Sequence, residues 1–300
     1  MTLSLRGVMG PVITTFSPST GELDLHAFQA NLRAHVAMGL HGVVVAGSTG
    51  EAVLLDEQER RQLVEAARAV TPADRALIVG AGAEATRTVI QRARDAAQAG
   101  ADAVLVVSPH YYTSAMTSEA LLAHFRRVAD ESPIPVILYN IPKYVGFTIS
   151  PAIVTELAAH PNIVGIKDSS GDRDLITVYV NAQRHSFSVL TGSATTFQGA
   201  LAAGARGGIL AAALFAPELT LRVYDAMLAG DVAAADAAQA RLTPLGATIV
   251  GAMGVAGVKA AMDFVALHGG PVRSPLRPLG KRDTAHVRAL LSDGALAASA

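Results

Sequence analysis

The chain has 300 residues, a hydrophobic fraction of 51% and a formal net charge of −1 at pH 7. This length and apolar content suit one large α/β domain or two smaller ones. The near-neutral charge gives no electrostatic reason to expect nucleic acid or an anionic membrane as a partner, and the absence of cysteine excludes disulfides, thiolate zinc sites and a cysteine nucleophile.

The sequence shows no pattern typical of export or of a membrane span. Residues Met1 to Arg6 lack the charged-then-apolar pattern of a secretory signal, and no apolar run approaches the ~20 residues of a membrane span. We therefore expect a cytoplasmic protein. The mean hydropathy of +0.36 is high for a monomer, which predicts apolar surface buried between subunits.

Short apolar runs with strand character alternate along the chain with amphipathic helical stretches. Several runs are continuous, as expected for strands covered on both faces. The eight runs are Val8–Phe16, Gly42–Ala46, Ala76–Val79, Ala103–Val107, Pro135–Tyr139, Ile163–Ile166, Phe187–Leu190 and Gly208–Ala211. The helical stretches between them are Leu25–Met38, Asp56–Val70, Glu84–Ala99, Ser118–Ala129, Pro151–Ala158 and Leu175–Asn181.

This alternation predicts a (β/α)8 TIM barrel. A doubly wound open sheet is the alternative, but it usually has a nucleotide loop after its first strand, where this chain has only Gly10-Pro11. After Leu214 the strand pattern stops, and further helices are expected over Glu218–Ala229, Ala233–Leu242, Val255–His268 and Asp283–Leu291. The sequence thus predicts a barrel domain of residues 1–224 and a C-terminal helical domain of residues 225–300 packed on it.

A lysine follows the sixth apolar run. Ile163, Val164 and Ile166 form a buried strand, and Lys167 stands at its carboxyl end. Desolvation disfavours an ammonium group and lowers its pKa, and a neutral amine can attack a ketone to form a Schiff base. A strand-end lysine more commonly reaches solvent, so this segment alone leaves both interpretations open. The other lysines are Lys143, Lys259 and Lys281, and none of them ends an apolar strand run.

Polar residues follow other predicted strands, and in a barrel such ends carry the chemistry. Strand two ends in Gly47-Ser-Thr-Gly-Glu51, whose hydroxyl and backbone N–H groups could hold a carboxylate, although a simple glycine-rich turn is equally compatible. Strand five ends at Tyr139, which could shuttle protons beside a desolvated lysine or sit as a rim aromatic. Strand seven ends at Gly192, and strand eight begins with Gly207-Gly208, which leaves room for a ligand.

Other chemistries lack their motifs. His35 and His41 are six residues apart with no carboxylate cluster, so no metal site is predicted. The sequence has no Gly-x-Ser-x-Gly motif and no P-loop, and Gly80-Ala-Gly82 lacks the third glycine of a dinucleotide-binding motif.

Taken together, these residues resemble the N-acetylneuraminate lyase/dihydrodipicolinate synthase family of class I aldolases. The likeness runs from Gly10-Pro-Val-Ile-Thr-Thr-Phe16 to Arg273-Ser-Pro-Leu-Arg-Pro-Leu279. Its most specific markers are Gly47-Ser-Thr-Gly-Glu51, Tyr139-Asn-Ile-Pro142 and Gly165-Ile-Lys-Asp168. The resemblance implies a TIM barrel with a C-terminal helical domain, assembled as a homotetramer of two tight dimers.

The resemblance also implies roles for individual residues. Three are catalytic: Lys167 forms the Schiff base with pyruvate, Tyr139 is the general acid/base, and Tyr111 is lent across the tight dimer to the neighbouring active site. The implied substrate-binding residues are Ser48 and Thr49, which hold the carboxylate of the 2-oxo acid, together with Ser169, Gly192 and Ile209, whose backbone carbonyl faces the pyruvyl group. No metal or organic cofactor is implied, because the protonated imine serves as the electron sink.

Within the family the sequence most resembles 4-hydroxy-2-oxoglutarate aldolases, which implies cleavage of that substrate to pyruvate and glyoxylate. The resembling stretches include Ser132-Pro-Ile-Pro-Val136, Lys167-Asp-Ser-Ser-Gly-Asp172 and Gly269-Gly-Pro271. Dihydrodipicolinate synthases carry an arginine where this chain has Tyr144, and N-acetylneuraminate lyases carry an acidic pair where it has Ser193-Ala194.

Three alternatives stay open from the sequence. The first is dihydrodipicolinate synthase, which condenses pyruvate with aspartate semialdehyde. The second is a 2-oxo-3-deoxy sugar acid aldolase or dehydratase. The third is a non-catalytic binder of 2-oxo acids, and the combination of Lys167, Tyr139 and Tyr111 argues against it. Because neighbouring residues of an extended loop point apart, we expect Lys143 to turn away from the site and not to replace the missing arginine.

Overall fold

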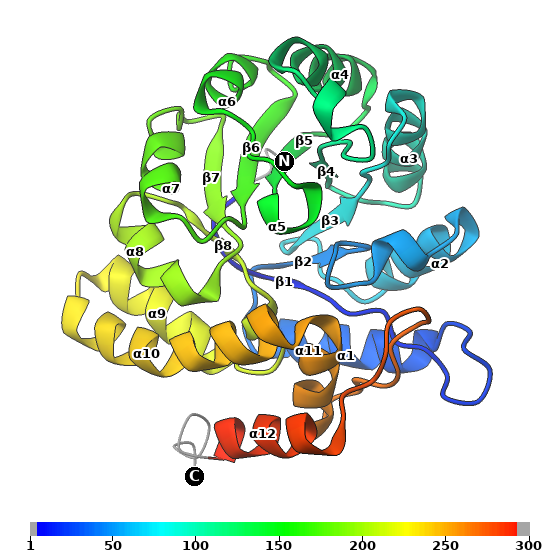
Figure 1. Cartoon of the computed structure of the whole chain (residues 1–300), viewed down its shortest axis with the longest axis vertical. Coiled ribbons are helices and arrows are strands. Elements are labelled where there is room, and N and C mark those ends of the chain that lie inside the picture. The colour runs from blue at the N-terminus through cyan, green and yellow to red at the C-terminus, as the bar shows by residue number, and fades with distance from the viewer. Residues whose placement is uncertain (1–4, 293–300) are drawn as a thin grey trace.

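A closed barrel of parallel strands forms the centre of the molecule (Figure 1). The computed structural model describes residues 5–292. Within that range, eight strands pair in chain order and β1 closes on β8. They are β1 (Gly7–Pro11), β2 (Gly42–Val45), β3 (Ala76–Gly80), β4 (Ala103–Val107), β5 (Val136–Asn140), β6 (Ile163–Asp168), β7 (Ser188–Thr191) and β8 (Gly207–Ile209). The TIM barrel expected from the sequence is confirmed.

The strands are apolar because both of their faces are buried. Side chains on a strand alternate between faces, so neighbours belong to different clusters. Val44 packs in an inner cluster with Ile78, while Val43 and Val45 pack in the outer cluster with the helices. Tyr139 belongs to the inner cluster, which directs its side chain into the barrel.

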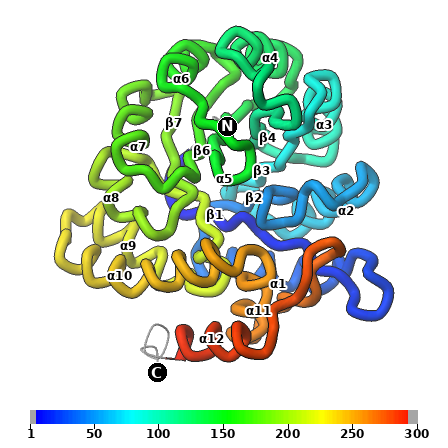
Figure 2. Tube along the Cα trace, in the orientation of Figure 1, coloured from blue at the N-terminus to red at the C-terminus, as the bar shows by residue number. Residues whose placement is uncertain are grey.

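Helices with one apolar face cover the outside of the barrel (Figures 1 and 2). The Asp24 carboxylate caps the first of them by accepting from the Ala27 N–H, and Asp56 and Glu59 form a reciprocal capping box on the second. These helices are α1 (Leu25–Ala37), α2 (Glu57–Arg68), α3 (Thr86–Gln98), α4 (Ser118–Glu131), α6 (Pro151–Leu157), α7 (Arg173–Val180) and α8 (Phe197–Ala202). The single turn α5 (Pro142–Val145) instead follows β5 directly and lies over the end of the barrel (Figure 1).

The C-terminal part of the chain is helical, as expected, and its helices gather along one side of the barrel (Figures 1 and 2). They are α9 (Pro217–Ala229), α10 (Val232–Leu245), a π-helix (Gly246–Ala252), α11 (Gly254–Phe264) and α12 (Lys281–Ser292). Residue 224 lies inside α9, so the division into residues 1–224 and 225–300 stays a proposal. The outer ends of these two predicted domains, residues 1–4 and 293–300, lie outside the described range.

Some predicted boundaries are wrong. The first strand ends at Pro11 instead of Phe16; beyond it, the Thr14 and Thr15 hydroxyls donate to the carbonyls of Gly50 and Asp24, which binds this segment to loops. The eighth strand ends at Ile209, because residues 211–214 form a 3-10 turn. The short helices α5 and α8 were not predicted, since four to six residues carry too little periodicity.

Candidate active site

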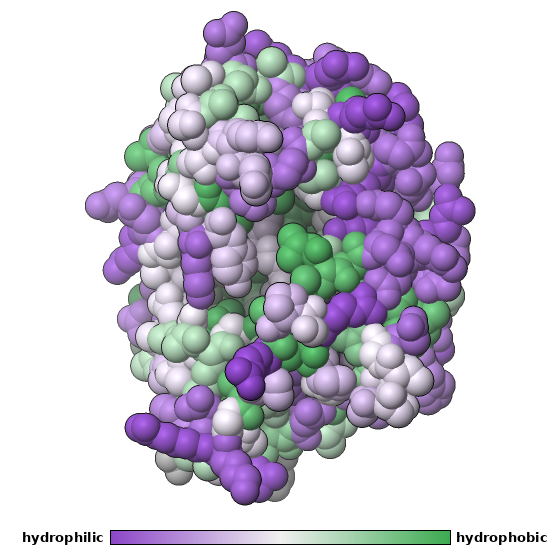
Figure 3. All heavy atoms as spheres, turned by 45° about the vertical axis from the view of Figure 1, so that its right-hand side comes forward, coloured by the Kyte–Doolittle hydropathy of each residue, from purple (hydrophilic) through white to green (hydrophobic). Residues whose placement is uncertain are grey.

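A pocket of about 360 Å³ opens at the carboxyl ends of the strands. The space-filling view shows a hollow near the middle of one face, beside a group of apolar side chains (Figure 3). Strand ends line it on one side and the C-terminal helices on the other. Of the residues singled out from the sequence, it brings together Ser48, Thr49, Tyr139, Lys167, Ser169, Gly192 and Ile209.

Lys167 and Tyr139 face each other across neighbouring strands. They are register partners in the β5–β6 pair, and the Lys167 Nζ lies 4.4 Å from the centre of the Tyr139 ring. Each residue is only 5% exposed. An aromatic face attracts the ammonium form of a lysine, and the same ring carries a phenol hydroxyl that can exchange protons. The arrangement therefore suits a nucleophilic amine with a proton carrier beside it.

The next residue on each strand fixes this geometry from the outer face. Asn140 donates from Nδ2 to Asp168 Oδ1 at 2.7 Å, and the Ser170 hydroxyl donates to Asp168 Oδ2 at 2.7 Å. Burial raises the pKa of Asp168. The Asn140–Asp168 bond joins the ends of β5 and β6, so it holds Tyr139 and Lys167 in register. The sequence signal for this pair was a polar residue directly after each candidate catalytic residue.

Gly192 keeps space open beside the lysine. A Cβ at this position would overlap the Ser169 Oγ and lie 2.9 Å from the Lys167 Cε. The Gly192 N–H donates to the Asp168 carbonyl at 2.6 Å, and the Ser169 N–H donates to the Asn140 carbonyl at 2.8 Å. The end of β7 thus packs directly on the candidate nucleophile, and any larger residue there would displace the side chains of Ser169 and Lys167.

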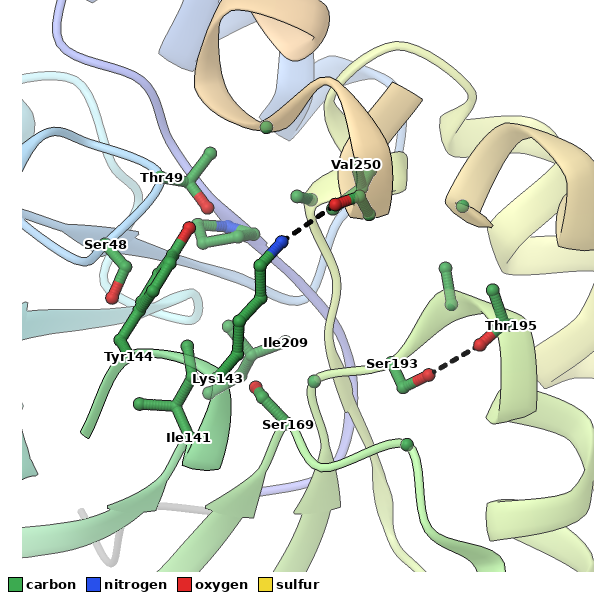
Figure 4. Close-up of a pocket in the computed structure, with 18 of the residues that line it drawn as sticks. Ser48, Thr49, Ile141, Lys143, Tyr144, Ser169, Ser193, Thr195, Ile209 and Val250 are labelled. Carbon is green, nitrogen blue, oxygen red and sulfur yellow. Dashed lines mark hydrogen bonds between the residues drawn. The ribbon is translucent and has the colours of Figure 1, made fainter. Parts of the chain in front are cut away.

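Ser48 and Thr49 lie on a tight loop after β2. Two non-glycine residues that bracket the loop have left-handed backbones: Ala46 with φ 51° and Glu51 with φ 57°. Gly80 lets this loop approach β3, since a Cβ there would overlap the Ala46 carbonyl oxygen. The hydroxyl of Thr49 faces the hydroxyl end of Tyr144 (Figure 4).

Lys143 turns into the pocket, contrary to the expectation from the sequence. Residues Pro142–Val145 form one turn of helix, α5, and not an extended loop, so Lys143 and Tyr144 both line the pocket. The Lys143 Nζ donates to the Gly251 carbonyl at 2.8 Å (Figure 4). Burial and the neighbouring Tyr139 raise the pKa of Tyr144, so its hydroxyl is neutral at pH 7.

The opposite wall of the pocket is the π-helix, which sequence reasoning missed. Pro244 stands near the end of α10 and lacks the N–H that a regular α-helix needs, and the backbone then continues as a π-helix over Gly246–Ala252. Such π-segments occur frequently at functional sites. Small side chains on this wall leave room for a ligand; the lining residues are Gly246, Ala247, Val250 and Gly251.

Tyr111 does not join the pocket of its own chain. Its side chain is 77% exposed and makes an edge contact with Tyr112. The loop is nevertheless fixed, because Glu84 Oε2 accepts from the backbone N–H groups of His110 at 3.0 Å and Tyr111 at 2.9 Å. Its predicted role in a neighbouring subunit stays a prediction.

Residues 5–292 contain neither a metal-binding cluster nor a membrane-spanning helix. No group of three or more His, Asp or Glu side chains in that range could hold a metal ion. No helix there is long and apolar enough to cross a membrane.

Comparison with known proteins assigns the chain to one family. The family model of the dihydrodipicolinate synthetase family matches residues 4–293. The 4-hydroxy-tetrahydrodipicolinate synthase of Methanoculleus marisnigri is 35% identical over 95% of this chain and 98% of its own length. The 4-hydroxy-tetrahydrodipicolinate synthase 1 of Streptomyces coelicolor is 38% identical over 96% of this chain and 93% of its own.

A solved structure supports the same family assignment. YagE of E. coli K12, a prophage protein of the dihydrodipicolinic acid synthase family in complex with pyruvate, is 28% identical. It superposes with a TM-score of 0.90 over 97% of this chain and 99% of its own. The chain therefore belongs to the dihydrodipicolinate synthetase family and is a carbon–carbon lyase that acts through a lysine Schiff base.

Proposed function

We propose that Lys167 forms an imine with pyruvate. The enamine of this imine adds to an aldehyde that carries a carboxylate or, in the reverse direction, is left when the adduct is cleaved. The observation that carries the proposal is the buried Lys167 amine against the Tyr139 ring, 4.4 Å from its centre, in a pocket that also contains the hydroxyls of Ser48 and Thr49. A pyruvate complex of the family member YagE supports the choice of 2-oxo acid.

The Lys167 amine adds to C2 of pyruvate, and water leaves as one proton is taken up, which gives a protonated imine. That proton is balanced when C3 loses one to water, which gives an enamine whose C3 attacks the aldehyde carbon. Tyr139 donates its proton to the new alkoxide and regains one from water, and hydrolysis of the product imine frees Lys167. In the reverse direction the Tyr139 phenolate takes the proton from the C4 hydroxyl. Ser48, Thr49 and their backbone N–H groups hold the pyruvyl carboxylate; Ser169 and the Ile209 carbonyl complete its surroundings.

The far end of the pocket suits an anionic group. The Lys143 ammonium reaches across it to the Gly251 carbonyl at 2.8 Å, and a ligand carboxylate would compete with that carbonyl for the same donor. Aspartate semialdehyde and glyoxylate each carry a carboxylate. The names of the relatives favour the first: our leading candidate is 4-hydroxy-tetrahydrodipicolinate synthase, which condenses pyruvate with aspartate semialdehyde.

Cleavage of 4-hydroxy-2-oxoglutarate, expected from the sequence, is the second candidate. It is supported by one observation, the neutral Tyr144 at the position where dihydrodipicolinate synthases carry an arginine. An arginine matches a carboxylate with a planar, permanently charged fork, whereas Tyr144 offers one hydroxyl. The names of the relatives support this candidate less well than the synthase. The homotetramer, the cytoplasmic location and the absence of a cofactor stay expectations.

Two measurements test the proposal. Borohydride added with pyruvate should reduce the imine and mark the peptide that contains Lys167 by mass; a mark on Lys143 or Lys259, or no mark, would overturn the Schiff-base assignment. The kcat/KM for pyruvate plus aspartate semialdehyde is then compared with that for cleavage of 4-hydroxy-2-oxoglutarate. A synthase reaction ten or more times more efficient supports the leading candidate, and the reverse ratio establishes the second.

A further inference from the structure

A buried ion pair lies directly behind the candidate carboxylate-binding loop. The Lys259 Nζ is 2.5 Å from the Glu51 Oε1, and the two residues are 1% and 2% exposed. Lys259 belongs to α11 in the C-terminal part, whereas Glu51 follows Ser48-Thr49-Gly50 by one residue. Lys259 also donates to the Pro271 carbonyl at 2.6 Å and lies 4.6 Å from the centre of the Phe16 ring.

The second oxygen of the same carboxylate is held from the same side. The backbone N–H of Arg273 donates to Glu51 Oε2 at 2.8 Å. The Arg273 guanidinium donates to both oxygens of Glu59, at 2.6 and 2.7 Å, and to the Leu54 carbonyl at 2.9 Å. Both ends of the stretch from Glu51 to Glu59 are therefore attached to the C-terminal segment that contains Arg273.

The backbone of Glu51 explains why this attachment bears on the loop. Its φ of 57° is left-handed, a conformation that a residue with a Cβ adopts only where the surroundings hold it. The Glu51 backbone is bonded locally, since its N–H donates to the Ser48 carbonyl at 3.2 Å and its carbonyl accepts from the Leu54 N–H at 2.8 Å. Its carboxylate is held by Lys259 and Arg273. Release of the carboxylate would remove the part of this support that comes from the C-terminal helices, and Thr49 is only two residues away.

We propose that Glu51, Lys259 and the Arg273 segment form a clamp through which the C-terminal helices position Ser48 and Thr49 for the substrate carboxylate. The inference rests on the proposed function of that loop. None of these three residues lines the pocket, so they are positioning residues and make no contact with substrate.

A purely structural attachment elsewhere in the same region provides a matched control. Asn31 of α1 exchanges two hydrogen bonds with the backbone of His268: its Nδ2 donates to the carbonyl at 2.7 Å and its Oδ1 accepts from the N–H at 2.9 Å. Asn31 is 3% exposed. This contact also ties the barrel to the C-terminal segment, but its partner on the barrel is α1 and not the loop of Ser48 and Thr49.

The test compares Lys259→Met, Glu51→Gln and Asn31→Ala with the wild type, each as the full chain. For each variant we would measure Tm, KM for pyruvate, and borohydride labelling of Lys167 at saturating pyruvate. We expect Lys259→Met and Glu51→Gln to raise KM for pyruvate tenfold or more while labelling at saturation still reaches completion. Asn31→Ala should lower Tm but leave KM for pyruvate within twofold of the wild type.

The outcomes separate the clamp from the proposed function. Absence of labelling in the wild type would overturn the Schiff-base function itself. Normal wild-type labelling with an unchanged KM in the folded clamp variants would overturn the clamp alone, as would an equal rise of KM in Asn31→Ala. If the two charge-removing variants do not fold, Glu51→Asp, which keeps the charge and shortens its reach, supplies the same comparison of KM.

Discussion

Lys167 and Tyr139 are register partners on adjacent strands, with the lysine Nζ 4.4 Å from the centre of the tyrosine ring. The candidate nucleophile and the candidate proton carrier are therefore set by the pairing of β5 with β6 and not by a mobile loop. Asn140 and Asp168 lock that pairing one residue further on, with a hydrogen bond of 2.7 Å. A site built on regular elements is held more precisely than one built on loops.

Tyr139→Phe tests the proton-transfer role of the hydroxyl. The variant keeps the ring against Lys167 and removes only the group that exchanges the proton. We expect kcat to fall by about 10²–10⁴, the usual share of a positioned acid or base, while borohydride with pyruvate still marks Lys167. A kcat within a few-fold of the wild type would show that Tyr139 packs against Lys167 but does not transfer the proton.

Gly192→Ala tests the close packing of β7 on the lysine. The added methyl group would overlap the Ser169 Oγ and lie 2.9 Å from the Lys167 Cε, so the lysine must move. We expect the rate of imine trapping to fall at least tenfold with little loss of folded protein. The control is Gly251→Ala on the opposite wall, where the nearest atom to the new Cβ is 3.4 Å away; its trapping rate should stay near that of the wild type.

Mixing experiments test the predicted exchange of Tyr111 between subunits. Its side chain is 77% exposed and absent from the pocket of its own chain. If it completes a neighbouring site, inactive Lys167→Ala and Tyr111→Phe chains should regain activity when they form hybrids. Hybrids detected by native mass spectrometry that show no recovery would contradict the exchange.

The barrel and most of its site could be predicted because they depend on local pattern plus one geometric rule. Apolar runs mark strands, and parallel strands bring their carboxyl ends to one face of a barrel. Lys167, Tyr139, Gly192 and the Ser48-Thr49 pair each follow such a run, so the closed sheet collects them without further information.

The rest of the site depends on contacts that no local pattern records. Lys143 turns inward because Pro142–Val145 curls into one helical turn, which is too short to show a period. The π-helix of Gly246–Ala252 lines the pocket, but its run of small residues resembles any buried helix. The partners Glu51 and Lys259 are 208 positions apart and meet only when the C-terminal helices pack on the barrel.

His124 should make stability depend on pH. It is 7% exposed on α4, its Nδ1 lies 2.9 Å from the Thr86 hydroxyl, and burial lowers its pKa from 6.5 to about 4. Between these values the unfolded chain binds more protons than the folded chain. The stability contributed by neutral His124 is therefore present above pH 6.5 and lost as the pH falls towards 4, roughly 3 kcal/mol in all.

Urea unfolding at pH 7 and pH 5 measures this loss. By pH 5 the difference in unfolding free energy between wild type and His124→Gln should have shifted by about 2 kcal/mol in favour of the variant. His26→Gln, at an exposed position of α1, serves as the control and should keep the wild-type pH dependence. An equal pH dependence in wild type and His124→Gln would contradict the assignment.

We expect Lys143 and Tyr144 together to determine which aldehyde the enzyme accepts. The Lys143 ammonium lines the pocket and donates to the Gly251 carbonyl, so Lys143→Met should weaken the binding of any aldehyde that carries a carboxylate. A hydrogen bond to a charged group is worth about 1.5–3 kcal/mol, which corresponds to a tenfold to hundredfold loss of kcat/KM. Addition of pyruvate to propanal, which has no charge, should be unaffected.

Tyr144→Arg adds the guanidinium fork that dihydrodipicolinate synthases carry at this position, and it should raise kcat/KM for aspartate semialdehyde about tenfold. Tyr144→Phe controls for the lost hydroxyl. If Lys143→Met reduces activity with propanal as strongly as with aspartate semialdehyde, Lys143 acts on the fold of the π-helix wall and not on the carboxylate. In that case no group in the pocket is left to bind the carboxylate of the aldehyde, and 2-oxo-3-deoxy sugar acids, whose aldehyde half is uncharged, become the substrates to test next.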